Sequence, residues 1–487
     1  MAKASVKEGV EYAAMRNSLH VALVACLALP CSSTILARRG GSLDPPAQRG
    51  ADARNVELVG HNDLNGQGDG GEGLALQQWP DGRRILYLAH EAPQRCVSII
   101  DVTKPESPTL INQLPSPSPG VTRCNSLGLS GTVLTVANQA AKAGGTLAGM
   151  WVLDVSDPKK VSTAKSLDDL KLSFFDTSGP ESRGVHNLWF VDGEFAHLTT
   201  GMRDFSPTNP QDDQIWVVVD LRNPRQPREV GRWWLPGTRK GDRCLPGCLP
   251  SRHVPFDNGY RPHQIEIWPD HADRAYVAYI DGGAMIFDIS GLAQVKAGRA
   301  KSFTPRLISR LNFHPPYPAW THTFQPMFRR KLAWAADEDV QDNCKDAPKL
   351  VWLLDIRAET NPVIIGTAPL HANDGELCTR GGRFGAHNLH PNFPGPLYRQ
   401  LENTTVSTWF NGGVRIYRAV EGPKGVTDAP PHVEEIGYYI PEAPPKNPSG
   451  TIQINHAIVD ERGLIYANDR FTGGLYILRY TGTVPFD

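Results

Sequence analysis

Five histidines precede hydrophobic runs in the same register, and imidazole is the side chain that proteins use most often to bind transition metals. The segments are Val185-His186-Asn187-Leu188, Pro262-His263-Gln264-Ile265, Thr321-His322-Thr323-Phe324, Ala386-His387-Asn388-Leu389 and Asn455-His456-Ala457-Ile458. With 15 histidines in 487 residues, five coincidences of this kind need a structural cause. If the segments converge, we expect a metal site with His263, His322, His387 and His456 as ligands. Iron or copper is expected ahead of manganese, zinc or calcium.

Other residue types complete the predicted chemistry. Glu72 and Asn125 stand in the same register before two earlier hydrophobic runs. Glu72 and His186 are expected to move protons or to support the ligands, because a carboxylate or an imidazole beside a metal can act as a base. Arg383 is expected to orient an anionic substrate, since a guanidinium binds carboxylates in a fixed geometry. These roles predict a metal-dependent oxidoreductase that acts on a small molecule.

Two other interpretations fit the same residues. A metal-assisted lyase or hydrolase would neutralise an acidic substrate with manganese, calcium or zinc while a histidine or arginine removes a proton. A non-catalytic binding scaffold would use the histidines to bond neighbouring backbone groups. Weaker metal candidates are His61, the acidic turn 69–72 for calcium, and the pair Cys244 and Cys248 for zinc.

Composition and motifs exclude several function classes. The 50 basic and 51 acidic side chains are balanced, so no nucleic-acid partner is expected. The sequence contains no Gly-x-Ser-x-Gly elbow, no phosphate-binding Gly-Lys-Ser/Thr loop, no His-Glu-x-x-His and no strand–turn–helix dinucleotide fingerprint. Serine-triad hydrolysis, nucleotide hydrolysis and hydride transfer from NAD are therefore disfavoured.

The elements that must position these residues recur through the chain. Seven copies of a short apolar strand occur, most of them followed by an acidic residue and a turn. They lie at 98–102, 151–155, 217–221, 285–289, 352–356, 414–418 and 475–479. Spacings of about 50 to 70 residues match four-stranded blades with loop insertions, and small sheets bury both faces only when they stack around a ring. We predict an all-β, seven-bladed β-propeller with four-stranded blades.

The two ends of the chain predict how the ring closes. The strand-like residues 56–59 precede the first blade, while the last copy ends at Tyr480 with almost no chain left. We therefore expect the N-terminal strand to complete blade seven. The innermost strand of each blade runs along the axis, so the residues at its start, including the five histidines, converge at one mouth.

The repeat, apolar-Asp-Val-Ser/Thr-x-Pro, resembles that of the secreted bacterial LVIVD-repeat propeller family. Three further segments, at 378–387, 409–414 and 437–441, are similar to motifs of that group. The resemblance covers residues 55–482. It implies a β-propeller that is exported, and it implies little about chemistry because the family is largely without assigned activity.

The N-terminal region and the cysteines also predict export. Residues 1–37 are typical of a signal peptide, because Arg16 precedes the apolar run 21–29 and small residues follow. That run is too short for an integral membrane span, although Leu23-Val24-Ala25-Cys26 also matches a lipoprotein cleavage box. Residues 38–54 are predicted to be a flexible linker and 55–487 the propeller.

Six cysteines follow the predicted signal peptide, and an even number favours disulfides in an oxidising compartment. Nearest-neighbour pairing is one of the fifteen connectivities that six cysteines allow. We expect a periplasmic or secreted protein, with lipoprotein anchoring as an alternative.

Overall fold

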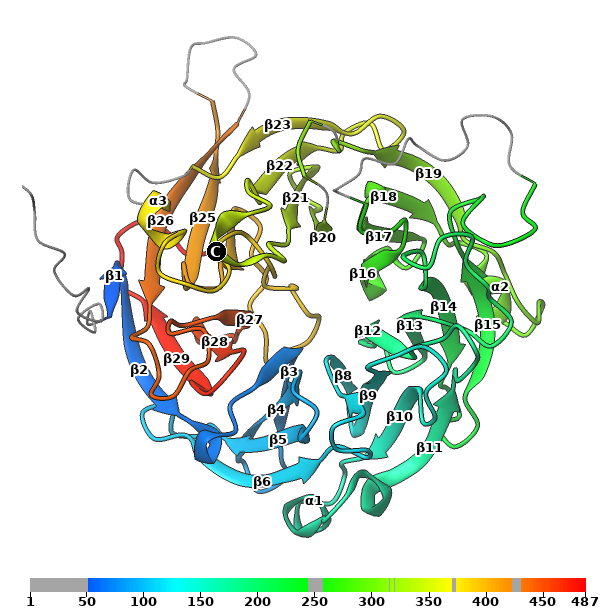
Figure 1. Cartoon of the computed structure of the whole chain (residues 1–487), viewed down its shortest axis with the longest axis horizontal. Coiled ribbons are helices and arrows are strands. Elements are labelled where there is room, and N and C mark those ends of the chain that lie inside the picture. The colour runs from blue at the N-terminus through cyan, green and yellow to red at the C-terminus, as the bar shows by residue number, and fades with distance from the viewer. Residues whose placement is uncertain (1–50, 244–256, 315, 319, 370–373, 423–430) are drawn as a thin grey trace, which may run out of the picture. The chain divides into compact units, whose positions relative to one another are not determined.

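Seven antiparallel sheets surround a common axis in the computed structural model, as Figure 1 shows. The structure describes residues 51–243, 257–314, 316–318, 320–369, 374–422 and 431–487. Residues 48–487 form one compact unit, so the predicted seven-bladed β-propeller is confirmed. The predicted signal peptide 1–37, residues 38–50 of the predicted linker, and Cys244 and Cys248 lie outside the described residues.

The strands of each blade follow one another from the axis outward. Blade one contains β3 (Gly70–Gln78), β4 (Arg84–His90), β5 (Arg95–Asp101) and β6 (Thr109–Pro115). Blade two contains β7 (Thr122–Arg123) and β8 (Leu127–Ser130), which both pair with β9 (Val133–Ala140), then β10 (Gly149–Asp154) and β11 (Lys171–Asp176). Blade three contains β12 (Val185–Trp189), β13 (Phe195–Thr200), β14 (Ile215–Asp220) and β15 (Arg228–Trp233).

The remaining blades repeat this order. Blade four contains β16 (Pro262–Glu266), β17 (Arg274–Tyr279), β18 (Gly283–Asp288) and β19 (Arg306–Leu311), and blade five β20 (Thr321–Met327), β21 (Leu332–Asp337), β22 (Val351–Asp355) and β23 (Val363–Thr367). Blade six contains β24 (Thr404–Thr408), β25 (Val414–Val420), β26 (His432–Ile440) and β1 (Asp52–Arg54), and blade seven β27 (Ile454–Val459), β28 (Leu464–Asp469), β29 (Leu475–Tyr480) and β2 (Val56–Asn62).

Short helices lie in the connecting loops. They are the 3₁₀ turns η1 (Leu64–Gly66), η2 (Leu167–Leu170), η3 (Pro269–His271) and η4 (Asp342–Cys344), and the α-helices α1 (Pro158–Thr163), α2 (Leu292–Lys296) and α3 (Asp374–Leu377). Within the described residues, no helix has both the length and the hydropathy that a membrane crossing requires.

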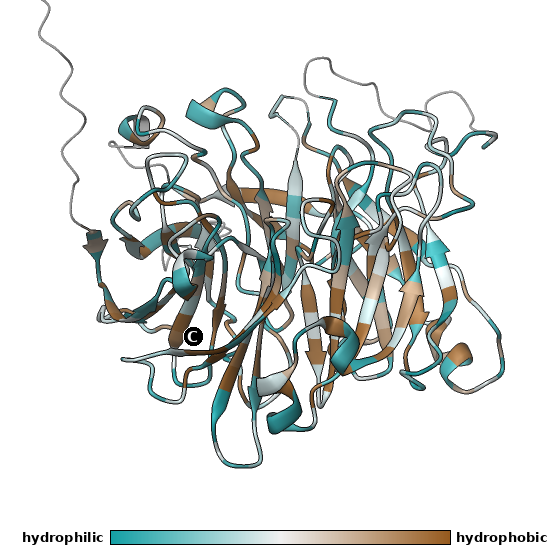
Figure 2. Cartoon of the chain, turned by 60° about the horizontal axis from the view of Figure 1, so that its bottom comes forward, coloured by the Kyte–Doolittle hydropathy of each residue, from teal (hydrophilic) through white to brown (hydrophobic). Residues whose placement is uncertain are grey.

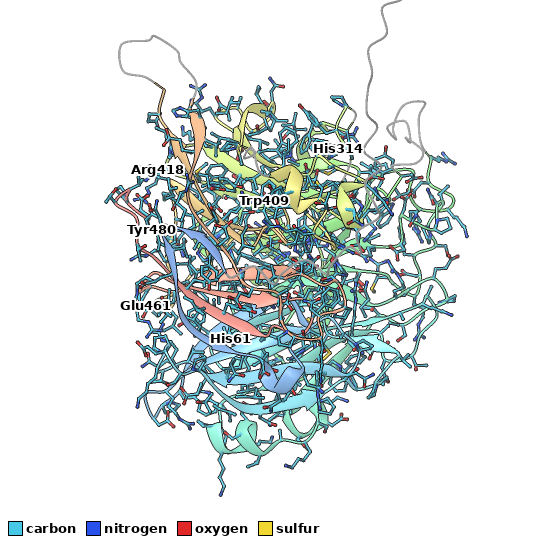
Figure 3. All side chains as sticks on the ribbon, turned by 60° about the vertical axis from the view of Figure 1, so that its left-hand side comes forward. His61, His314, Trp409, Arg418, Glu461 and Tyr480 are labelled. Carbon is cyan, nitrogen blue, oxygen red and sulfur yellow. A yellow bond between two sulfur atoms is a disulfide. The ribbon has the colours of Figure 1, made fainter. Side chains whose placement is uncertain are left out.

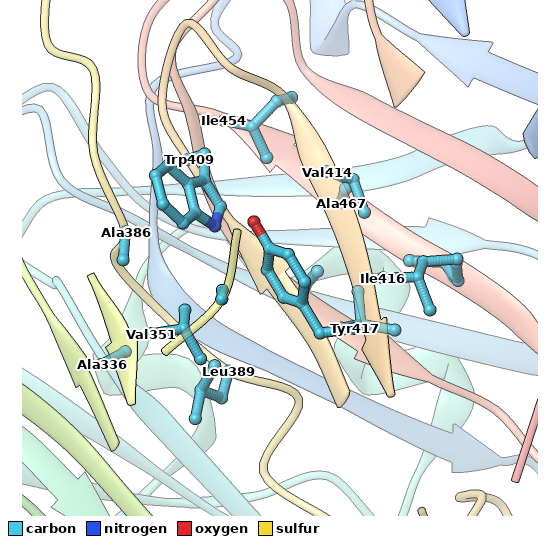
Figure 4. Packing of buried hydrophobic residues seen from close by; sticks show 14 of the residues in the cluster. Ala336, Val351, Ala386, Leu389, Trp409, Val414, Ile416, Tyr417, Ile454 and Ala467 are labelled. Atoms are coloured by element: carbon cyan, nitrogen blue, oxygen red, sulfur yellow. The ribbon is translucent and has the colours of Figure 1, made fainter. Parts of the chain in front are cut away.

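The repeated strand of the sequence is the same strand in every blade. The seven copies fall on β5, β10, β14, β18, β22, β25 and β29. These strands are apolar along most of their length because the blades on either side cover both faces of the sheet. Figure 2 shows the resulting pattern, with hydrophobic residues along the strands. One buried cluster spans three blades and contains Val351 of blade five, Tyr417 of blade six and Ala467 of blade seven (Figure 4).

The N-terminal segment closes the ring, as predicted. Strand β2 pairs with β29, with Val56 opposite Tyr480, and so completes blade seven. Strand β1 pairs with β26 and forms the outer edge of blade six. Residues 52–54, which the sequence analysis placed in the linker, are therefore part of a blade.

Blade six has an irregular segment where the other blades have an innermost strand. The backbone N–H of His387 donates to the carbonyl of Thr408 at 3.0 Å, and that of His390 donates to the carbonyl of Val406 at 2.8 Å. Residues 386–390 thus line the axis beside β24, while β1 supplies the outermost strand. Blade six therefore has four regular strands and, on their axial side, an inner segment that is not a regular strand.

Residues 390–400 close one end of the axis. They contact the far ends of the innermost strands of five blades. Tyr398 Oη accepts from Leu76 N at 2.8 Å, and Trp268 Nε1 donates to the carbonyl of Asn392 at 3.0 Å. Gln325 Nε2 donates to the carbonyl of His390 at 2.6 Å. The rings of Phe393 and Trp189 lie 5.2 Å apart, and Arg399 N donates to the carbonyl of Val459 at 3.2 Å.

Two disulfides join segments that are distant in the sequence. Cys96 bonds Cys124, and Cys344 bonds Cys378. The first links blades one and two, and the second links the loop after β21 to the segment that leads to His387. Two pairs of the nearest-neighbour connectivity are therefore confirmed.

Candidate metal centre

A β-bulge at the start of the innermost strand positions the predicted histidines. In blade three, Val185 lies opposite Thr200 and Asn187 opposite Thr199, so His186 is an extra residue without a partner in the ladder. A bulge re-aims the side chain of its extra residue. The same interruption of register surrounds His263 in blade four, His322 in blade five and Glu72 in blade one.

Blade seven differs from this pattern by one residue. Ile454 lies opposite Asp469 and His456 opposite Asn468, so the extra residue is Asn455. The sequence comparison aligned His456 with the other histidines, but a shift of one residue in a strand sends the side chain to the other face. Asn455 takes the position at the axis, where its Nδ2 donates to the carbonyl of Gly70 at 2.8 Å.

Glu72 lies among four imidazoles. Its Oε1 is 3.9 Å from His186 Nε2 and 3.9 Å from His387 Nε2. Its Oε2 is 3.9 Å from His263 Nε2 and 3.7 Å from His322 Nε2. The Glu72 side chain is only 7% exposed, and the four histidines are buried. We call these five residues the histidine ring.

Three of the imidazoles have a hydrogen-bond acceptor at Nδ1, which leaves Nε2 with its lone pair toward Glu72. His387 Nδ1 donates to the carbonyl of Asn455 at 2.8 Å, and His322 Nδ1 donates to Thr323 Oγ1 at 3.0 Å. The Nε2 atoms of His322 and His387 have no hydrogen-bond partner among the described residues. Buried polar atoms normally have partners, so these two nitrogens are suited to act as ligands of a metal ion.

His186 is oriented in the same way. Its Nδ1 donates to Gln139 Oε1 at 3.0 Å, and Arg123 Nε donates to the same oxygen at 2.9 Å. Because a guanidinium only donates, Arg123 fixes the glutamine oxygen toward His186, and its Nη2 also lies 3.4 Å from His186 Nδ1. The Nε2 atoms of His186 and His263 lie 2.8 Å apart.

Burial favours the neutral form of His186, His263 and His387, and the neutral imidazole is the form that binds metals. It lowers the pKa of His186 to about 3, against the opposing charge of Glu72. Burial, followed by the neighbouring His322, also holds the pKa of His263 and of His387 well below the usual range. Burial alone would raise the pKa of Glu72, but the surrounding imidazoles, His263 first, hold it well below its usual value.

Glu338 is a site residue that was not among the predicted ligands or catalytic residues. Its Oε2 lies 3.9 Å from His322 Nε2 and its Oε1 lies 3.7 Å from His387 Nε2. Arg383 Nη1 is 3.1 Å from Glu338 Oε1. Arg383 was expected to orient a substrate, and the structure places it against this carboxylate. The available sequence signal was the acidic pair Asp337 and Glu338 in the turn after β21.

The potential ligand atoms form three overlapping groups among the described residues. In each group three atoms lie within 4.8 Å of one another. The groups are Glu72, His186 and His263; Glu72, His322 and His387; and His263, His322 and Glu338. Of the predicted metal ligands, the structure brings His263, His322 and His387 together with the predicted catalytic residues Glu72 and His186. His456 belongs to none of the groups.

A charged layer borders the ring at the same end of the inner strands. Glu91 Oε1 lies 2.6 Å from Arg123 Nη1 and 2.7 Å from Arg470 Nη2. These side chains are 15%, 30% and 19% exposed, respectively, so they reach solvent. Arg203 and Asp204 do not belong to this layer, because Arg203 pairs with Asp176 and Asp204 pairs with Arg232.

The weaker metal candidates do not join the ring. His61 lies on β2 at the outer edge of blade seven, where Figure 3 labels it, and its Nε2 donates to the carbonyl of Gly473 at 2.6 Å. In the acidic turn 69–72, Asp69 belongs to none of the ligand groups, and Glu72 belongs to the histidine ring.

No family model and no curated protein matches the chain. Solved structures with a similar fold include the β-propeller domain of Cps50 (Swd1) from Myceliophteria thermophila, at 13% identity and a TM-score of 0.45 over 84% of this chain and 96% of that chain. The C-terminal WD40 domain of Sif2 is 10% identical, with a TM-score of 0.42 over 84% and 81% of the two chains. U3-55K is 10% identical, with a TM-score of 0.46 over 87% and 98%. These similarities concern the fold alone.

Proposed function

We propose that the protein is an exported, iron-dependent oxidoreductase that acts on a small molecule at the histidine ring. The observation that carries this proposal is the donor set. Glu72 forms one group with His186 and His263, and another with His322 and His387. Two histidines and one carboxylate are the donors of non-haem iron oxygenases, which favours iron among the transition metals. Bound iron would supply one-electron chemistry toward oxygen or substrate.

Contacts within the chain orient these donor side chains toward one another. The acceptors at Nδ1 hold His186, His322 and His387 with Nε2 inward, and burial keeps the rings of His186 and His387 neutral. Arg383 holds Glu338 beside the ring. Ligands that are already oriented lose little conformational entropy when they bind.

The two ends of the axis support a substrate class. Residues 390–400 close one end, so the substrate would approach through the layer of Glu91, Arg123 and Arg470 at the other. Two partly exposed guanidinium groups beside a cationic centre favour an anionic small molecule. The predicted role of Arg383 in orienting such a substrate stays a part of this proposal.

Export and family membership belong to the proposal as well. The disulfides Cys96–Cys124 and Cys344–Cys378 support an oxidising compartment. The repeat on the same strand of all seven blades supports membership of the LVIVD-repeat propeller family. Expression in a bacterial host with fractionation tests the first point, since accumulation of the unprocessed chain in the cytoplasm would contradict export.

Elemental analysis tests the metal proposal. The full chain is purified from the periplasm without a histidine tag, beside the double variant His322→Ala/His387→Ala and the control His61→Ala. We expect iron in the parent and in the control, and loss of at least half of it in the double variant. Bound manganese, calcium or zinc in place of iron would contradict the redox assignment and favour a lyase or hydrolase. A folded parent that stays metal-free after anaerobic addition of ferrous iron would leave the scaffold interpretation.

A further inference from the structure

We infer that the histidine ring binds two metal ions, with the Glu72 carboxylate as a bridge between them. This inference rests on the proposed function, because it specifies how many ions the same residues hold. It comes from the separation of the ligand atoms, which does not fit a single ion.

One ion cannot collect all four imidazoles in the observed arrangement. First-row metals bind nitrogen and oxygen ligands at about 2.0–2.2 Å, so two ligands of one ion lie at most about 4.4 Å apart. Among the described residues, every group of ligand atoms within 4.8 Å of one another contains three residues and none contains four. His186 shares a group with His263 but with neither His322 nor His387.

Two of the three groups have only Glu72 in common, and they divide the imidazoles into the pair His186 and His263 and the pair His322 and His387. The third group, His263 with His322 and Glu338, lies between the pairs, and the rings of His263 and His322 are 3.8 Å apart. The Nε2 atoms of His186 and His263 are 2.8 Å apart, which is hydrogen-bonding distance and a little shorter than the separation of about 3.0–3.4 Å between adjacent ligands of one ion. The rings of His322 and His387 have centroids 4.3 Å apart, and their Nε2 atoms share the two oxygens of Glu338. We assign the first ion to the first pair and the second ion to the second pair with Glu338.

Glu72 reaches both pairs at once. Its Oε1 is 3.9 Å from one histidine of each pair, namely His186 and His387. Its Oε2 lies near the other two, at 3.9 Å from His263 and 3.7 Å from His322. The ions of two-metal sites are about 3.5–4 Å apart, a distance that a carboxylate can bridge. Because Glu72 and Glu338 offset only part of the charge of two divalent ions, the centre would keep a net positive charge and attract an anionic substrate.

Metal stoichiometry tests the inference. The full chain is stripped with a chelator, reloaded anaerobically with ferrous iron and desalted, and bound iron per chain is measured. We expect two equivalents in the parent and one in each of the single variants His186→Ala and His387→Ala. The matched control is His456→Ala, a buried histidine outside the ligand groups, which is expected to keep two.

Magnetic susceptibility gives a readout that does not depend on activity. A bridged pair of ions is expected to show magnetic coupling in the parent, and each single variant is expected to lose it. One equivalent in the parent, or two equivalents without coupling, would overturn the inference while leaving the proposed iron site intact. No bound iron in a folded parent would defeat the proposed function as well. The parent alone decides these outcomes if a variant fails to fold, which circular dichroism would reveal.

Discussion

His387 and His390 lie three residues apart on the inner segment of blade six, and both side chains are about 1% exposed. His390 uses both ring nitrogens, since Nε2 donates to the carbonyl of Arg399 at 2.8 Å and Nδ1 accepts from Val459 N at 3.1 Å. His387 uses Nδ1 only, and its Nε2 has no partner among the described residues. Burial is the same for the two residues, so what distinguishes His387 from His390 is its unpartnered Nε2, which faces Glu72 and Glu338.

The surroundings of the two histidines extend this difference to the two ends of the axis. At the closed end, the polar side chains of residues 390–400 are satisfied. Asn392, for example, donates to the carbonyl of Leu401 at 3.0 Å and accepts from its N–H at 2.9 Å. At the ring end, His322 Nε2, His387 Nε2 and His263 Nδ1 are buried and have no hydrogen-bond partner among the described residues. The polar groups at the closed end are therefore paired within the fold, whereas the ring end has unpaired nitrogens that the proposed metal site would use.

The largest expected effect is on stability at the closed end. Replacing His390 by Ala removes a buried ring and leaves Arg399 O and Val459 N without that partner, so the free energy of unfolding should fall by about 3–4 kcal/mol. Replacing His387 by Ala should cost less than about 1.5 kcal/mol in metal-free protein, because Asn455 O keeps donors from Asn388 and Thr408. Urea unfolding in the presence of a chelator measures both.

The control for this pair is His390→Asn, which keeps an acceptor for Val459 N but loses the donor to Arg399 O. It should fall between the parent and His390→Ala. Equal losses of stability in His387→Ala and His390→Ala would show that the unpartnered nitrogen does not distinguish the two histidines.

An intermediate effect is expected from acid. Burial, opposed by the hydrogen bond to Arg399 O, lowers the pKa of His390 from 6.5 to about 4. Between these two values the unfolded chain binds a proton that the folded chain does not, so stability falls as pH decreases from 6.5 to 4. One such histidine contributes a slope of about 1.4 kcal/mol per pH unit at most. Urea unfolding at several pH values should show a shallower slope in His390→Asn, and an unchanged slope would contradict the assignment.

The smallest effect is expected from Tyr398→Phe. This change removes the hydroxyl that accepts from Leu76 N, and we expect a loss of about 1 kcal/mol in the free energy of unfolding. Bound metal should not change, because Tyr398 lies at the closed end. Loss of metal from this variant would show that the two ends of the axis are coupled.

The sequence predicted the fold because the propeller repeats its signal. Seven copies of one strand, each preceded by another β-rich run, specify the blades, and the leftover strand at the N-terminus specifies the closure. The positions of His186, His263 and His322 followed from the same periodicity. Glu72 also held this register in the sequence, and the structure places it at the bulge of blade one.

The parts that the sequence did not predict depend on single-residue geometry or on distant contacts. The bulge of blade seven is centred on Asn455 rather than His456, and nothing in the local sequence marks that shift. Glu338 reaches the ring from a turn, and only the folded ring brings it near His322 and His387. Residues 390–400 look like an ordinary Pro- and Gly-containing loop, and their contacts with five blades come from segments up to 322 residues away.

The pairing of β2 with β29 also determines when contacts can form during synthesis of the chain. Strand β2 is synthesised early but finds its partner β29 only when the last strand has emerged. Glu72 belongs to the first blade and His387 to the sixth, so their carboxylate and imidazole become neighbours only when nearly the whole chain is present. If the proposed export and metal binding hold, a chain that crosses a membrane unfolded would take up metal only on the far side, from the ions present in that compartment.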